Sequence, residues 1–149
     1  MEESLRAKMD LDLKRALSSE SAIFHKVKLF GTCAGRYTAL GETDRIPDKE
    51  GLKSHIGNLM QVGAFFATEY AKRGPSPGVS QTRLAYMMGT LEKMKDDAET
   101  STRTLIEEGL ENVDRFELTM PCKKNLLLMV KVMCFTPPNQ PKSSECMKN

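Results

Sequence analysis

The stretch AIFHKVKLFGTC, residues 22–33, decides the fold that the sequence predicts. Apolar and polar residues alternate along it, as they do in a β-strand whose two faces have different surroundings. One face of this strand carries three aliphatic residues and a histidine: Ile23, His25, Val27 and Leu29. The other face carries two phenylalanines and two lysines: Phe24, Lys26, Lys28 and Phe30. Gly31, Gly35 and Gly41 follow and indicate a loop or a bulged second strand.

A further strand is predicted near the other end of the chain. Residues 126–135 form a nearly continuous apolar run that contains the β-branched Val130 and Val132 and is bounded by Lys-Lys-Asn and Pro-Pro. Such a run is typical of a buried central strand. A short buried helix is the alternative, because periodicity alone does not separate the two.

Helices are predicted between and before these strands. An amphipathic helix of about four turns occupies residues 1–17, and a second covers residues 50–72, where apolar residues recur every three or four positions. The sequence RGPSPGVS, residues 73–80, ends the second helix because it contains a glycine and two prolines. Ser80 is then the predicted N-cap of a long helix from residue 81 to about residue 116, with a weak point near residues 96–103.

Together these elements predict an α+β fold. A small antiparallel or mixed sheet packs against an amphipathic helical hairpin, and a helix precedes them at the N-terminus. The chain has 149 residues, which is the usual size of one domain. We expect a single globular domain over residues 1–136 and a disordered polar tail over residues 137–149.

Composition narrows the class of protein. Net charge is only +2, and 40% of the residues are hydrophobic, which argues against a strongly basic nucleic-acid binder and against wholesale disorder. The N-terminus resembles neither a secretory signal nor a mitochondrial presequence, and no apolar run is long enough to span a bilayer. The sequence therefore predicts an intracellular, cytoplasmic protein. Its four cysteines are then expected to be free thiols: Cys33, Cys122, Cys134 and Cys146.

Motifs that carry chemistry are missing from the sequence. There is neither a phosphate-binding loop nor a G-x-G-x-x-G pattern, and no two cysteines have a C-x-x-C spacing. His25 is interpreted as a core histidine, and His55 has no obvious nucleophile or carboxylate partner. We therefore expect no enzymatic activity, no cofactor and no metal site.

Two hypotheses about function remain. The first is a non-enzymatic interaction or assembly module that self-associates or binds a partner protein through an apolar stripe on the long helix. The stripe consists of Leu84, Met87, Leu91, Met94 and Leu105. The size of the whole chain and its ten methionines would suit a small viral structural or host-interaction protein.

The second hypothesis is single-stranded RNA binding. If the two strand regions pair, Lys131 joins Lys26 and Lys28 on one sheet face, where Phe24 and Phe30 flank them. A basic face with aromatic side chains is the kind of surface on which unpaired bases stack. The alternative is a sheet edge guarded by lysines against aggregation.

Overall fold

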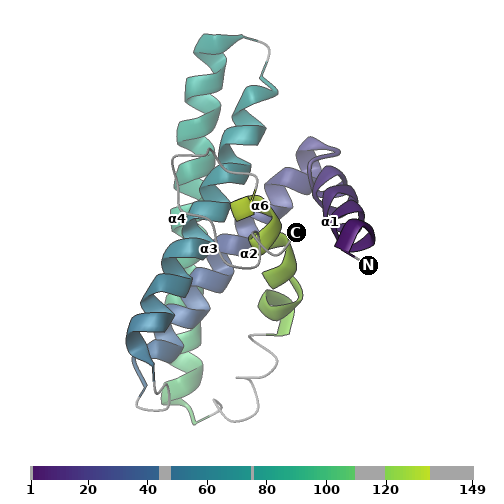
Figure 1. Cartoon of the computed structure of the whole chain (residues 1–149). Coiled ribbons are helices and arrows are strands. Elements are labelled where there is room, and N and C mark those ends of the chain that lie inside the picture. Colours follow the sequence, from purple (N-terminus) through teal and green to yellow (C-terminus); the bar gives the residue numbers. More distant parts are fainter. Residues whose placement is uncertain (1, 44–47, 75, 110–119, 135–149) are drawn as a thin grey trace.

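The computed structural model describes residues 2–43, 48–74, 76–109 and 120–134, and every regular element within these ranges is a helix (Figure 1). The helices are α1 (Glu2–Ala16), α2 (Glu20–Gly41), α3 (Lys49–Lys72), α4 (Pro77–Glu107) and α6 (Leu126–Cys134). The predicted α+β fold is therefore wrong, because the described part of the chain contains no strand for a sheet. The N-terminal helix and the helix over residues 50–72 are confirmed as α1 and α3. The predicted polar tail lies outside the described residues.

Helix α2 replaces both the first predicted strand and the glycine-containing loop. It begins after Ser19, whose hydroxyl oxygen accepts a hydrogen bond from the backbone N–H of Ala22 at 3.1 Å, as an N-cap does. Its buried residues follow steps of four and three: Ile23, Val27, Phe30 and Ala34. Alternation misled the prediction because the same segment also fits the helical period, and burial follows the helical period.

The glycines of α2 allow close packing against α4. A Cβ atom on Gly35 would overlap the carbonyl oxygen of Lys95, and one on Gly31 would lie 2.5 Å from the carbonyl oxygen of Leu91. Real Cβ atoms essentially never come that close to a backbone oxygen. Helix α4 therefore approaches the backbone of α2 more closely than any larger residue would permit.

Helices α2, α3 and α4 make the most extensive contacts with one another and form the centre of the fold (Figure 1). The rings of Phe30 on α2 and Phe66 on α3 are stacked, with centroids 5.9 Å apart. Met87 and Leu91 of α4 are fully buried in the same core. The predicted helical hairpin is present as α3 and α4, but it packs on α2 and not on a sheet.

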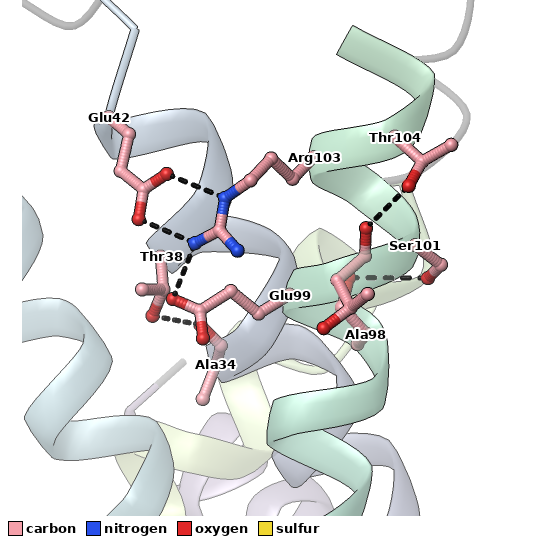
Figure 2. A network of polar contacts seen from close by, with 9 residues as sticks. Ala34, Thr38, Glu42, Ala98, Glu99, Ser101, Arg103 and Thr104 are labelled. Carbon is pink, nitrogen blue, oxygen red and sulfur yellow. Dashed lines mark hydrogen bonds and ion pairs between the residues drawn. The ribbon is translucent and has the colours of Figure 1, made fainter. Parts of the chain in front are cut away.

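Helix α4 begins earlier than predicted and has no break over residues 96–103. Its N-cap is Ser76 and not the predicted Ser80. The Ser76 hydroxyl accepts a hydrogen bond from the backbone N–H of Val79. At the other end, Arg103 holds α4 to the end of α2, as Figure 2 shows. Its guanidinium donates to both carboxylate oxygens of Glu42, at 2.8 and 3.1 Å.

Helix α6 replaces the last predicted strand, so the alternative of a short buried helix is the correct one. It packs against α1 and α3. A disulfide between Cys33 of α2 and Cys122, shortly before α6, ties the end of the described chain to the central helices. The prediction of free thiols is wrong for these two cysteines. Disulfides are typical of oxidising compartments, so this bond does not fit the free thiols that a cytoplasmic location led us to expect.

Of the helices that the structure describes, none combines the length and the apolar character that a membrane span requires.

Candidate functional site

A cavity of about 390 Å³ lies between α1, the first two turns of α2 and the segment that leads into α6. We call it the cationic pocket, because four of its lining side chains are basic: Arg15, Lys26, Lys124 and Lys131. The other lining residues are Asp12, Ala16, Ala22, His25, Asn125, Leu127 and Leu128. Volumes of this size are usual for sites that bind small molecules.

Helical spacing brings these residues together. Helix α1 contributes positions 12, 15 and 16, and α2 contributes positions 22, 25 and 26. Residues three and four apart share one face of a helix, so each helix presents one short stripe to the cavity. The third wall comes from positions 124, 127, 128 and 131.

Lys26 is fixed at the pocket by Asn125. Its ammonium donates a hydrogen bond to Asn125 Oδ1 at 2.8 Å, and Asn125 Nδ2 donates to the carbonyl oxygen of Pro121, also at 2.8 Å. The second bond turns the amide so that its oxygen faces Lys26. Burial lowers the pKa of Lys26, because the half-buried ammonium loses hydration. An anion in the pocket would favour the charged form of Lys26.

Lys131 is the most deeply buried charge of the site. Only 1% of its side chain is exposed, and its ammonium donates a hydrogen bond to Asp12 Oδ2 at 2.6 Å. This bond lowers the pKa of Asp12, against the opposing effect of desolvation, and the positive charges of Lys131, Lys8 and Arg15 lower it further. Asp12 is therefore ionised at neutral pH and neutralises Lys131.

The charge balance of the pocket is positive. Asp12 contributes its one carboxylate, and that carboxylate is already bonded to Lys131. Arg15, Lys26 and Lys124 add three further positive charges around the same cavity. Cations that line a concave surface favour anions, because low-dielectric walls concentrate their field.

The disulfide stabilises one wall of the pocket. Cys122 lies two and three residues before Lys124 and Asn125, and its partner Cys33 lies two turns after Lys26 on α2. The Cα atoms of the two cysteines are 5.7 Å apart. The bond therefore holds the segment that carries Lys124 and Asn125 against the helix that carries Lys26.

The structure separates the residues predicted to bind RNA. Lys26 and Lys131 line the cationic pocket. Phe24 and Lys28 line a second cavity of about 450 Å³ between α2 and α4. Phe30 is 1% exposed and belongs to the core. The described helices therefore offer no common face for these five residues, and their nucleic-acid role stays a prediction.

The residues predicted as a protein interface are largely covered within the monomer. Met87 and Leu91 are fully buried against α2 and α3. Leu84, Met94 and Leu105 are partly buried. The apolar stripe exists as predicted, but it serves the core of this chain, and self-association stays a prediction.

Sequence reasoning missed several residues of the pocket. His25 was expected in the core, yet it is exposed and lines the cavity. Arg15, Lys124 and Asn125 carried no motif that would have singled them out. Had residues 20–41 been interpreted as a helix, the spacing of Ala22, His25 and Lys26 would have placed them on one polar edge.

In the ranges that the structure covers, no three His, Cys, Asp or Glu side chains converge to hold a metal ion. Comparisons with known protein families, with curated proteins and with solved structures find no match to this chain.

Proposed function

We propose that the protein is a non-enzymatic binding module whose cationic pocket takes up a multiply charged oxyanion, such as a phosphate group. The observation that carries this proposal is the charge of the cavity: four basic side chains surround it, and Asp12, the one carboxylate among its described lining residues, is already engaged by Lys131. Phosphate offers several acceptor oxygens, which suits donors that approach from three different helices.

Lys131 adds a second argument. An ammonium group carries three donor hydrogens, and Asp12 accepts one of them among the residues that the structure describes. Burying such a group is costly unless its charge and its donors are satisfied. Because Lys131 lines the pocket, an oxyanion there can accept from the remaining donors.

Both earlier hypotheses relate to this proposal. RNA presents phosphates, so Lys26 and Lys131 would contribute to RNA binding through the same chemistry, without the aromatic stacking that the sheet face was to supply. Self-association would need a surface other than Met87 and Leu91, because both are fully buried. RNA binding and self-association would both have to be compatible with the positive charge of the cationic pocket.

Calorimetric titration with inorganic pyrophosphate tests the proposal. We expect saturable binding of the wild-type protein that weakens as salt is added. Lys26→Gln should lower the affinity by about 1.5 to 3 kcal/mol, the usual contribution of a hydrogen bond to a charged group. Arg15→Gln, at an exposed position on α1, should also weaken binding while leaving the melting temperature unchanged.

The matched control is Lys93→Gln, because Lys93 is 75% exposed on α4 and lies away from the cationic pocket. It removes the same charge and should leave pyrophosphate affinity unchanged. Failure of the wild type to bind pyrophosphate at low salt would refute the proposal. Equal losses in Lys26→Gln and Lys93→Gln would show that net charge, and not the pocket, attracts the anion.

A further inference from the structure

The two walls of the cationic pocket carry the same pattern of side chains. On α1, Leu11 lies between Lys8 and Arg15, at spacings of three and four residues. On the wall that includes α6, Leu127 lies between Lys124 and Lys131 at the same spacings. On α1 the three residues share one face of the helix, whereas on the other wall Lys124 precedes α6 and Lys131 is almost fully buried.

Both leucines are exposed to solvent. Leu11 is 48% exposed and Leu127 is 43% exposed, and they are two of the four large apolar side chains that stand out in this way on the described surface. Leu127 lines the pocket, and Leu11 is the neighbour of Asp12, which also lines it. Leu127 therefore borders the cavity that collects positive charge, and Leu11 lies one helical turn before Arg15, which lines the same cavity.

Positive charge surrounds these leucines. Lys8 and Arg15 are exposed, and their charges reach Asp12, since both contribute to lowering its pKa. Lys124 is exposed on the opposite wall. Leucines set among lysines and arginines are typical of surfaces that lie on membranes, where apolar groups enter the boundary between headgroups and acyl chains and cations contact lipid phosphates.

We propose that the mouth of the cationic pocket docks on an anionic phospholipid membrane. Leu11 and Leu127 enter the interfacial layer, Lys8, Arg15 and Lys124 contact headgroup phosphates, and the pocket receives the phosphate of one lipid. This inference rests on the proposed function, because it names a membrane as the source of the oxyanion. Charge complementarity selects an anionic membrane over an uncharged one.

Co-sedimentation with two kinds of vesicle tests the inference. We expect the wild-type protein to bind vesicles of equimolar phosphatidylcholine and phosphatidylserine, and to leave vesicles of pure phosphatidylcholine unbound. The double variant Leu11→Ser, Leu127→Ser should bind the anionic vesicles at least about tenfold more weakly, because the buried leucine surface contributes to interfacial binding. The single variant Leu11→Ser should still bind pyrophosphate as the wild type does, because Leu11 is not among the residues that line the pocket and every basic residue stays in place.

The matched control is Val79→Ser with Tyr86→Ser. On the described surface these are the other two large exposed apolar residues, 41% and 62% exposed, and both lie on α4, away from the pocket. Their replacement should leave vesicle binding unchanged. A control that loses vesicle binding as strongly as the Leu11 and Leu127 variant would overturn the inference, because the contact would not be specific to the pocket.

Four further outcomes decide whether one or both proposals stand. Pyrophosphate binding without binding to anionic vesicles would overturn the membrane inference and leave the proposed function standing. Vesicle binding that the two leucine substitutions do not weaken would also overturn it. A single-stranded RNA oligonucleotide that displaces the protein from vesicles at low concentration, with equal affinity for wild type and leucine variant, would assign the surface to RNA instead. Failure to bind pyrophosphate, vesicles or RNA would overturn both proposals.

Discussion

Replacing Gly35 with alanine should destabilise the protein, whereas the same change at Gly89 should stabilise it. Both glycines lie inside long helices, Gly35 in α2 and Gly89 in α4. A Cβ atom at Gly89 meets nothing within 4 Å. A Cβ atom at Gly35 would overlap the carbonyl oxygen of Lys95 and would lie 2.9 Å from both Ala98 Cβ and the backbone nitrogen of Glu99.

The magnitudes follow from two opposing effects. Alanine is favoured over glycine inside a helix by about 0.8 to 1 kcal/mol, and Gly89→Ala should gain that amount because nothing opposes it. Gly35→Ala gains the same propensity but pushes against the backbone of α4, which no side-chain rotation can relieve. Overpacking a well-filled interior costs about 1 to 3 kcal/mol and occasionally more. We therefore expect a net loss of up to about 2 kcal/mol for Gly35→Ala, and a difference of about 1 to 3 kcal/mol between the two variants.

Urea denaturation followed by far-ultraviolet circular dichroism measures both changes. Thermal unfolding should agree, because each kcal/mol of unfolding free energy shifts the melting temperature by about 3 °C in a chain of this length. Equal stability of the two variants, or stabilisation by Gly35→Ala, would refute the close approach of α2 and α4. Because that approach exists only if residues 20–41 are helical, the same result would also count against α2 itself.

Two other predictions concern the disulfide and the half-buried His55. The bond between Cys33 and Cys122 spans a sequence separation of 89, so replacing both with alanine should lower the free energy of unfolding by about 4 to 5 kcal/mol on the chain-entropy estimate; an unchanged urea midpoint would contradict the bond. Burial lowers the pKa of His55 below its ordinary value of 6.5, so the unfolded chain binds a proton at higher pH than the folded protein does. Stability should therefore fall as the pH drops from about 6.5, and less steeply in His55→Gln, which urea titrations from about pH 7 to pH 5 would measure.

The helices that could be predicted are those in which one periodicity dominates. In α3 the buried residues Leu59, Val62 and Phe66 recur at steps of three and four, and the helix lies where it was expected. In α2 the segment from Ile23 to Phe30 satisfies two periods at once, and the alternating one was chosen. Gly31 and Gly35 strengthened that error, because glycine usually marks loops and bulges, whereas here it allows two helices to approach.

The apolar run of α6 posed a different problem. A run without polar interruptions gives no periodicity to interpret, so only its length and β-branched residues favoured a strand. In the structure Lys131 faces Asp12 of α1, and this pairing over a sequence distance of 119 residues has no local signal. The disulfide is equally non-local, because spacing alone does not reveal which cysteines meet.

The candidate site escaped prediction because it lies on the parts of the chain with the weakest patterns. The apolar stripe of α4 suggests a surface for partners, yet Met87 and Leu91 lie in the core. Helices that build the core bury their apolar stripes against one another. A binding surface must therefore be formed by residues that lie outside those stripes. Here α1 and α6 pack at the periphery of the central helices and bring their basic residues to one cavity. Our proposal of a binding site therefore rests on where folding brings charges together, and not on the apolar pattern of the sequence.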